Sequence, residues 1–287
     1  MLTPQPQAKK LAQALGLKTG LYLKREDLHP HGSHKGRSIP VMIAMYSKLG
    51  WMNFCISSSG NAALAAIYAI KADKNLSLYI YVGRHIPKDK LEMLKLASGG
   101  NKKIIIEQVD RPKQTAFQMD KKGKAKNLRQ STDDSALIGY EALAGELAEI
   151  KNLAAVFIPT SSGAMAQGLY NGFKKHNLNP QIHIVQTPAC HPFIDSPITG
   201  PSAANAIVDK IGLRKEGVLK TLKDSGGRGW IVFDEEIHDI KRKLFDINET
   251  ELANISANSA LSIAGLAQAI KNNWRFNGPV VCLITGR

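Results

Sequence analysis

The chain has 287 residues, 44% of them apolar and 22% charged, which is typical of a globular protein with one large or two modest domains. Its three cysteines are scattered without a CxxC pair, which argues against a disulfide framework and a zinc site, and no metal site is expected. The net charge of +14 is spread along the chain, and the densest basic run, residues 121–129, is not interleaved with aromatic residues, so we expect no specific nucleic-acid partner.

Short apolar runs alternate with helical patterns along most of the chain, which predicts parallel sheets with crossover helices. In the first half this pattern predicts strands at 21–27, 52–58, 76–83 and 102–109, and helices at 61–72 and 89–100. The pattern weakens between residues 110 and 131, a polar and basic segment with Pro112, which favours a crossover between two domains.

Regular alternation resumes in the second half. We expect helices at 135–150, 164–176, 234–245 and 259–273, and strands at 154–160, 182–187, 229–233 and 279–286. No apolar run has the length of a membrane span, and the N-terminus lacks the apolar core of a secretion signal, so we expect a cytoplasmic protein without membrane attachment.

Three junctions between a strand and a helix carry small polar residues, where open α/β sheets bind ligands. In the first, HPHGSHKGRSIP (29–40), Gly32 and Gly36 flank Lys35 and allow a ligand to approach its amine. A lysine that forms a Schiff base must lose its proton readily, and His34 or Arg37 would lower its pKa. On this string alone, an ordinary surface lysine is the better interpretation.

The other two junctions resemble anion sites. SSSGNAALAA (57–66) places serines and a glycine before a helix that begins near Asn61, which suits a carboxylate or is a plain helix cap. IPTSSGAMAQG (158–168) also opens a helix and suits a phosphate, although its two glycines make a weak phosphate loop by themselves.

The order and spacing of these segments resemble the fold-type II pyridoxal-phosphate (PLP) enzymes, the tryptophan-synthase-β-like group. LYLKREDLHPHGSHKGR is similar to the strand and lysine segment of that family, SSSGNAA to its Ser-Ser-Gly-Asn turn, and the closing strand VVCLITG to the strand that ends in a hydroxyl residue. The tracts SAANAIVDKIG, DSGGRGWIVFDEEI and NSALSIAGLAQAI are most similar to the threonine synthase branch.

The resemblance implies a role for each matching residue. Lys35 would form the Schiff base with the cofactor and then act as the general base. Asn61 would bind the phenolic oxygen of the cofactor, Thr285 its ring nitrogen, and Ser161, Ser162, Gly163, Ala164 and Met165 its phosphate. Ser58, Ser59 and Gly60 would hold the carboxylate of an amino-acid substrate. A hydroxyl at Thr285 does not keep the ring nitrogen protonated, which suits elimination and replacement better than transamination.

The family also implies the architecture. We expect two open three-layer α/β domains with mostly parallel sheets and the cofactor in the cleft between them. The smaller domain would contain residues 31–130, and the larger one residues 1–30 with 131–287. Family members are commonly dimers, so a homodimer is an expectation of the resemblance alone.

Some positions depart from the family pattern. His31 and His34 stand where relatives carry Thr and an aromatic residue, and we expect a local effect on Lys35 over simple packing. The phosphate loop of relatives is richer in glycine than the segment that contains Ser161, Ser162, Ala164 and Met165. These four residues fit such a loop only if their φ angles are not positive. Ser256 stands where many relatives carry a Glu near the cofactor.

The leading hypothesis is a PLP-dependent lyase, a threonine synthase that converts O-phosphohomoserine to threonine and phosphate. Arg129 is a candidate for the substrate phosphate, although an exposed loop cation is an equally good interpretation. The alternatives are a threonine or serine dehydratase, or a related ammonia-lyase, and a non-catalytic relative that binds a metabolite.

Overall fold

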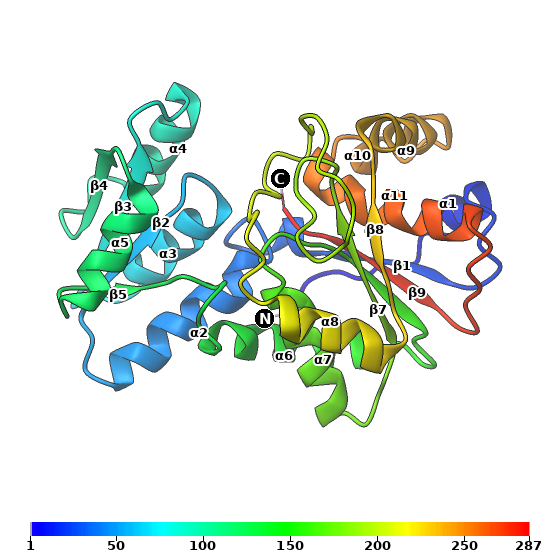
Figure 1. Ribbon diagram of the computed structural model, residues 1–287, viewed down its shortest axis with the longest axis horizontal. Coiled ribbons are helices and arrows are strands. Elements are labelled where there is room, and N and C mark those ends of the chain that lie inside the picture. Colours follow the sequence, from blue (N-terminus) through cyan, green and yellow to red (C-terminus); the bar gives the residue numbers. More distant parts are fainter. Residues whose placement is uncertain (1, 287) are drawn as a thin grey trace. The chain divides into compact units, whose positions relative to one another are not determined.

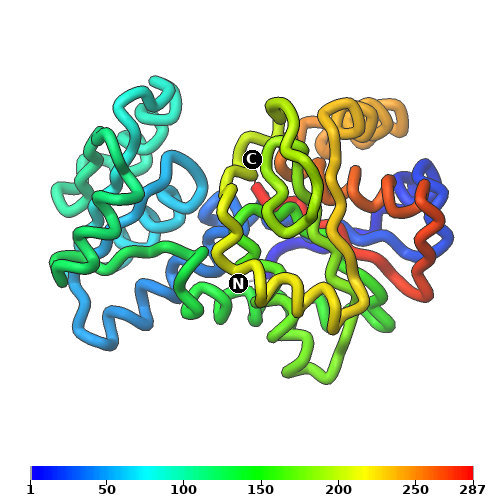
Figure 2. Tube along the Cα trace, viewed as in Figure 1, coloured from blue at the N-terminus to red at the C-terminus, as the bar shows by residue number. Residues whose placement is uncertain are grey.

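The computed structural model describes residues 2–286, which divide into two compact units. The larger unit contains the chain up to Leu28 and from Tyr140 onward, and the smaller unit contains His29–Gly139. Each unit is built around its own parallel sheet (Figure 1), so the expected α/β fold class is confirmed. The chain leaves the larger unit once and returns to it, as the change of colour along the trace in Figure 2 shows.

The sheet of the larger unit has the strand order β1-β9-β6-β7-β8, with all neighbouring strands parallel. Its strands are β1 (Leu21–Arg25), β6 (Ala155–Pro159), β7 (Gln181–Gln186), β8 (Gly229–Ile231) and β9 (Val280–Ile284). The β6 and β9 runs are buried at every position, because a parallel sheet is covered on both faces.

Helices cover both faces of this sheet, with α9 and α11 on one side and α7 and α8 on the other (Figure 1). The helices of the unit are α1 (Lys9–Ala14), α6 (Ser135–Ala148), α7 (Ala164–Lys175), α8 (Lys215–Ser225), α9 (Asp234–Asp246), α10 (Thr250–Ala253) and α11 (Ala257–Lys271), with α6 beginning in the smaller unit; a short 3-10 helix, Glu26–Leu28, follows β1.

The N-terminal segment covers the edge strand β1. The backbone N–H groups of Leu23 and Arg25 donate to the carbonyls of Pro6 and Pro4, at 3.0 and 2.9 Å. Beneath this strip, the buried Lys24 donates to the carbonyl of Thr3 at 2.8 Å and to Glu146 at 2.5 Å. The pairing with Glu146 and the carbonyl of Thr3 offsets the cost of burying this ammonium group, and the N-terminal strip closes the edge of the sheet to other chains.

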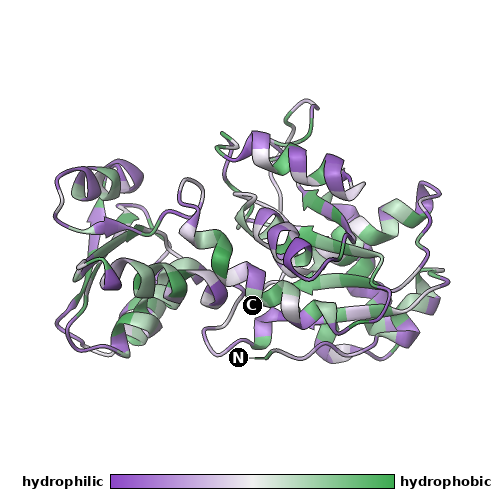
Figure 3. Ribbon diagram, turned by 90° about the horizontal axis from the view of Figure 1, so that it is seen from below, coloured by the Kyte–Doolittle hydropathy of each residue, from purple (hydrophilic) through white to green (hydrophobic). Residues whose placement is uncertain are grey.

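The sheet of the smaller unit has the order β4-β3-β2-β5 and is also parallel. It contains β2 (Asn53–Ser57), β3 (Ser77–Gly83), β4 (Ile104–Val109) and β5 (Lys126–Asn127), with helices α2 (Lys35–Lys48), α3 (Asn61–Lys71), α4 (Lys88–Ser98) and α5 (Pro112–Lys121). In Figure 3 the green of hydrophobic residues lies mostly on the strands of both sheets, while the purple of hydrophilic residues lies on helices and loops.

The expectation that residues 110–131 form a crossover between domains was wrong. This segment contains α5 and β5, and both belong to the smaller unit. Pro112 is the first residue of α5, a position that needs no backbone N–H, so it begins a helix there. The chain passes between the units inside α6 instead, after Gly139.

The first turn of α6 packs tightly on α2 within the smaller unit. A Cβ at Gly139 would lie 2.0 Å from the carbonyl oxygen of Arg37, and Ser38 Oγ donates to the carbonyl of Ala136 at 2.8 Å. Between residues 2 and 286, no helix combines the length and the hydropathy needed to cross a membrane.

Candidate active site

Lys35 is the first residue of α2 in the smaller unit. Gly32, with a φ of 75°, turns the chain ahead of the helix, and Ser33 Oγ accepts the backbone N–H of Lys35 at 3.3 Å. Gly36 has no room for a side chain, because a Cβ there would lie 2.2 Å from Cε1 of His29. The loop therefore presents Lys35 at a fixed point, as Schiff-base chemistry requires.

The amine of Lys35 contacts a residue that the sequence analysis did not identify. Its Nζ donates to Oε1 of Gln130 at 2.5 Å, and Gln130 is 7% exposed. Gln130 follows β5, the neighbour of β2 in the sheet. An amide accepts this hydrogen bond without adding negative charge, whereas a carboxylate would hold the lysine in its charged form.

The histidines near Lys35 have structural contacts. The ring of His31 stacks on Tyr68, with 5.5 Å between the ring centroids, and meets the edge of His29 at 5.3 Å. Burial lowers the pKa of His31, so its ring is neutral at neutral pH and adds no positive charge. This packing supports a structural role for His31, and an effect of His31 on Lys35 stays a prediction. His34 precedes the helix as its N-cap, and Arg37 is buried in the first turn.

The expected substrate loop lies at the same edge of the sheet as Gln130. Ser58, Ser59 and Gly60 follow β2, and Asn61 is the first residue of α3. The backbone N–H of Gly60 donates to Ser58 Oγ at 3.3 Å, which folds the loop back on itself. The N-terminus of an eleven-residue helix opens at this loop, where backbone N–H groups and the helix dipole favour an anion.

Arg129 lies beside Gln130 after the carboxyl end of β5. Its Nε donates to Ser131 Oγ at 3.1 Å, and the side chain is half-buried. The parallel strands β2 and β5 end at one edge, so this guanidinium stands on the same edge as the Ser58–Asn61 turn.

A pocket of about 350 Å³ opens at the carboxyl ends of β2, β3 and β4 in the smaller unit. It is lined by Ser59, Gly83, Arg84, His85, Ile86, Pro87 and Asp110. The strand order places it on the side of β2 away from β5 and Gln130. Arg84 already pairs with Asp110, with 2.5 Å between Nε and Oδ1, so the pocket wall carries a neutralised ion pair.

The expected phosphate loop connects β6 to α7 in the larger unit. Gly163 has a φ of 82°, and a Cβ there would lie 2.4 Å from Cγ2 of Val218. Between residues 2 and 286, the non-glycine residues with positive φ are Asn152, Asn177, Asn248 and Asn273, all outside this loop. Ser161, Ser162, Ala164 and Met165 therefore meet the backbone condition set for them.

The donor groups of this loop suit a phosphate. Ser161 Oγ accepts the backbone N–H groups of Val208 and Asp209, both at 3.1 Å. A hydroxyl with two accepted bonds keeps its own hydrogen to donate. Ser162 Oγ lies 3.4 Å from the backbone nitrogen of Ala164, at the start of α7. Hydroxyl donors at the N-terminus of a twelve-residue helix match the charge and the acceptor oxygens of a phosphate group.

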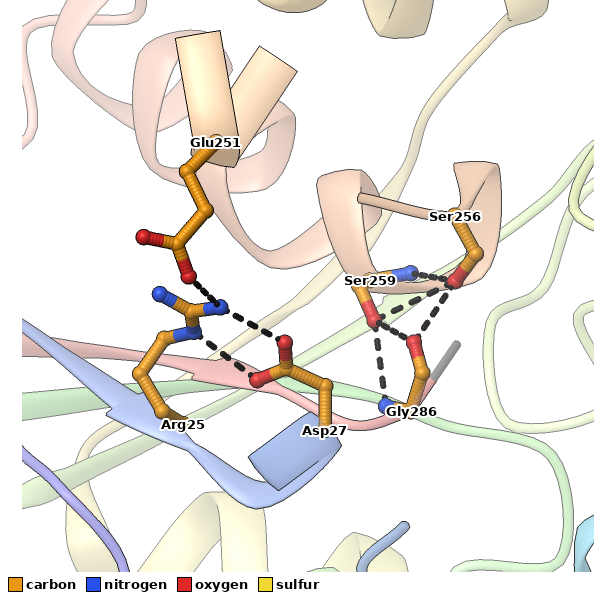
Figure 4. Close-up of polar contacts among 6 residues, drawn as sticks. All are labelled: Arg25, Asp27, Glu251, Ser256, Ser259 and Gly286. Atoms are coloured by element: carbon orange, nitrogen blue, oxygen red, sulfur yellow. Dashed lines mark hydrogen bonds and ion pairs between the residues drawn. The ribbon is translucent and has the colours of Figure 1, made fainter. Parts of the chain in front are cut away.

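Thr285 directly follows β9 and is 5% exposed. Strands β9 and β6 are parallel neighbours, with Val281 opposite Val156, so Thr285 and the phosphate loop emerge at one edge of the sheet. The next residue, Gly286, is bound by Ser256 and Ser259 (Figure 4). Ser256 stands where many relatives carry a Glu near the cofactor, and here it is the N-cap of α11, so this position has a structural role.

The same figure shows a second polar group at this edge of the larger unit. Arg25, at the end of β1, makes two hydrogen bonds to the carboxylate of Asp27, at 2.9 and 2.8 Å, and a third to Glu251 at 3.0 Å (Figure 4). Within residues 2–286, no three His, Cys, Asp or Glu side chains gather as metal ligands would.

Comparison with known proteins agrees with this chemistry. Residues 2–286 match the family described as "Pyridoxal-phosphate dependent enzyme". The chain is 27% identical to the threonine synthase of Methanocaldococcus jannaschii, over 99% of this chain and 74% of that protein. It is also 27% identical to the L-serine dehydratase/L-threonine deaminase of Mus musculus, over 60% of this chain and 53% of that protein.

Solved structures share the fold. Threonine deaminase isoform 2 from Solanum lycopersicum has a TM-score of 0.83 at 22% identity, covering 99% of this chain and 78% of that one. Maize serine racemase has a TM-score of 0.80 at 19% identity, covering 99% and 87%. The match over nearly every residue, together with the donor groups described above, shows that the chain belongs to the family of pyridoxal-phosphate dependent enzymes.

Proposed function

We propose that this enzyme is a lyase that acts on an amino acid by elimination and replacement, and that its reaction is that of a threonine synthase. In that reaction the Cγ–O bond of O-phosphohomoserine breaks and phosphate leaves. Water then adds its oxygen to Cβ, and Cγ becomes the methyl group of threonine. The proposal rests on the chemistry of the residues at the two sheet edges and on the extent of the sequence similarity.

The observation that carries the reaction type is the buried hydroxyl residue Thr285, which follows β9 at the same sheet edge as the phosphate loop. Bound pyridoxal phosphate supplies an electron sink for the carbanion formed on the substrate. A hydroxyl at the ring nitrogen leaves that sink weaker than a carboxylate would. A weak sink suits reactions in which a leaving group drains the negative charge, as phosphate does here.

The proposed substrate is supported by the share of this chain over which it is similar to threonine synthases. Threonine synthases from Methanocaldococcus jannaschii, Methanosarcina acetivorans and Mycobacterium tuberculosis are similar over 99% of this chain. The mouse L-serine dehydratase/L-threonine deaminase is similar over 60%. The second candidate function, a threonine or serine dehydratase, is favoured by the threonine deaminase fold with its TM-score of 0.83.

Lys35 takes the central role in both reactions. Its Nζ would hold the cofactor and would move protons at the substrate carbons. The hydrogen bond to Gln130 holds Nζ at a defined position in the smaller unit. Proton transfer requires such a defined position, because the base must lie within hydrogen-bond reach of the carbon acid.

The remaining residues bind and orient. Asn61 would donate to the phenolic oxygen of the cofactor, and the Ser58–Gly60 turn would hold the substrate carboxylate with backbone and hydroxyl donors. Residues 161–165 would hold the cofactor phosphate at the N-terminus of α7. Arg129, at the edge where the Ser58–Gly60 turn also ends, would bind the phosphate of the substrate by a charge-assisted hydrogen bond.

The test measures products from purified protein loaded with pyridoxal phosphate. O-phosphohomoserine, threonine and serine are supplied separately, and inorganic phosphate, threonine and ammonia are quantified. Stoichiometric threonine and phosphate from O-phosphohomoserine are the expected result. Ammonia from threonine or serine, with no threonine formed from O-phosphohomoserine, would replace the proposal by the dehydratase. Lys35→Ala is the inactive control, and the exposed helix-end variant Lys48→Ala is the active one.

A further inference from the structure

Both backbone polar groups of Gly286 are bound by two serines at the start of α11 (Figure 4). Ser259 Oγ accepts the Gly286 N–H at 3.2 Å and donates to the Gly286 carbonyl at 2.7 Å. Ser256 Oγ donates to the same carbonyl at 2.9 Å. Ser256, Ser259 and the Gly286 backbone are called the serine clamp below.

The serine clamp fixes the backbone of Thr285. The nitrogen of Gly286 and the carbonyl carbon of Thr285 belong to one planar peptide unit, so a bond to that N–H sets the orientation of the whole unit. On the other side, the strand ladder holds the chain up to Ile284, which pairs with Arg25. Thr285 therefore lies between two fixed peptide units, and small shifts of its hydroxyl are restricted.

The clamp is anchored on the first turn of α11. Ser259 is fully buried, and Ser256 Oγ also accepts the Ser259 backbone N–H at 3.3 Å as the N-cap of α11. Beyond the clamp, the helix buries an unbroken run of residues 259–266. Hydrogen bonds shielded from water hold their geometry better than exposed ones, because water does not compete for the same groups.

The first turn of α11 is also connected to the phosphate loop. Asn258 Oδ1 accepts the backbone N–H of Ala206 at 2.9 Å. Two residues later, the N–H groups of Val208 and Asp209 bind Ser161 Oγ. One helix start thus supports both Thr285 and Ser161, the two parts of the larger unit that the proposed function assigns to opposite ends of the cofactor.

We propose that Ser256 and Ser259 are positioning residues that set the Thr285 hydroxyl for its hydrogen bond to the ring nitrogen of the cofactor. The inference rests on the proposed function, in which Thr285 makes that bond. It concerns geometry at one atom of the cofactor, so it predicts a selective effect. Loss of the clamp weakens binding of a ligand that has the ring nitrogen more than binding of a ligand that lacks it.

The experiment compares pyridoxal 5′-phosphate with its 1-deaza analogue, in which a C–H replaces the ring nitrogen. Dissociation constants are measured by equilibrium dialysis, and the ratio of the constant for the 1-deaza analogue to that for pyridoxal phosphate is compared between variants, which cancels the intrinsic difference between the two compounds. We expect Thr285→Ala and Ser259→Ala to lower this ratio by about two- to tenfold relative to the wild type, the range for one hydrogen bond.

Matched variants separate positioning from general damage. Ser262→Ala removes another fully buried serine of α11, whose Oγ bonds to the carbonyl of Ser259, and should keep the wild-type ratio. Ser256→Ala should lower the ratio, and Ser256→Thr should restore it because threonine keeps both the hydroxyl and the helix cap. If Ser259→Ala does not fold, the Ser256 pair carries the test.

Two results would overturn the inference, and they are distinguishable. Suppose that Thr285→Ala lowers the ratio of dissociation constants, while Ser256→Ala and Ser259→Ala weaken binding of the two compounds by the same factor. The two serines would then have only a structural role, and the role of Thr285 would stand. If Thr285→Ala keeps the wild-type ratio of dissociation constants, Thr285 does not bind the ring nitrogen. The inference about the serine clamp then fails together with the proposed role of Thr285.

Discussion

Gln130 and Lys35 lie 95 positions apart in the chain, and their side chains meet at 2.5 Å. The acceptor is a neutral amide, so this hydrogen bond fixes the position of the amine and itself adds no negative charge. We predict that Gln130→Glu raises the pKa of the Lys35 amine and slows capture of pyridoxal phosphate at neutral pH, because the nucleophile is the uncharged amine. The pH at which capture is half-maximal should rise, as followed by the visible absorbance of the bound cofactor.

Gln114→Glu is the control for this change, since it adds the same charge on the exposed face of α5. Its pH profile should match the wild type. An unchanged profile in Gln130→Glu would contradict the role given to the amide.

The identity of the cofactor lysine is tested separately. Reduction of the loaded protein with borohydride should attach the cofactor permanently to Lys35, and mass spectrometry of its peptide locates the adduct. Lys35→Ala should give no adduct, whereas Lys48→Ala, at the other end of α2, should give a full one. An adduct on a different lysine in the wild type would refute the assignment.

Gly163→Ala should lower the stability of the protein and the affinity of the phosphate loop for pyridoxal phosphate, for two reasons. The positive φ costs an alanine about 1–2 kcal/mol, and its Cβ would meet Val218 at 2.4 Å. Gly226 has a similar φ of 69°, but a Cβ there would meet no atom within 4 Å, so Gly226→Ala measures the cost of the backbone conformation alone. In urea unfolding, Gly163→Ala should lose more stability than Gly226→Ala, and only Gly163→Ala should lose affinity for pyridoxal phosphate. Equal affinities in the two variants would exclude residues 161–165 as the phosphate site.

Arg129→Ala tests the substrate phosphate. A charge-assisted hydrogen bond to phosphate is worth about 1.5–3 kcal/mol, so KM for O-phosphohomoserine should rise by about ten- to a hundredfold with a smaller change in kcat. Arg111→Ala removes an exposed arginine from the same unit that does not line the pocket with Ser59, and it should leave KM near the wild-type value. If the two variants have the same KM, Arg129 is only a loop cation.

His183 should make stability depend on pH. Trp230 Nε1 donates to His183 Nδ1 at 3.1 Å, so the imidazole proton lies on Nε2, which faces Gln181. Burial lowers the pKa of His183 to about 3. Between about pH 6.5 and pH 3, the imidazole is therefore protonated in the unfolded chain but not in the folded chain. The free energy of unfolding falls as the pH is lowered through this window.

The slope from this one group is at most about 1.4 kcal/mol per pH unit, and it is measured by urea unfolding at several pH values. His183→Phe should be less stable at neutral pH, because the Trp230 N–H loses its acceptor, but its slope should be shallower. His238→Gln, on an exposed position of α9, serves as control and should keep the wild-type slope. A wild-type slope in His183→Phe would assign the pH dependence to other groups.

The strands were predictable because burial on both faces leaves an uninterrupted apolar run, as in VVCLI of β9. Helix α5 was missed for the opposite reason: it buries one residue, Ala116, and its other positions resemble a loop. Pro112 was taken as a break, although the first position of a helix accepts proline.

Lys35 was proposed from the order and spacing of several segments, because its own string is typical of an ordinary surface lysine, and its role stays a prediction. Gln130 was not predictable, since its function depends on a contact across the fold that no spacing in the sequence encodes. The serine clamp was hidden in the same way, because Ser256 and Gly286 meet only once α11 packs beside β9.

The strip of chain that covers β1 has a practical consequence for handling this protein. Pro4 and Pro6 offer carbonyls to the edge strand but, lacking N–H groups, offer no donors for further pairing. Trimming the first seven residues would uncover the β1 ladder and strip Lys24 of its bond to Thr3. The trimmed protein should form oligomers through that edge and precipitate more readily, so purification tags are better removed by a protease that cuts ahead of these residues.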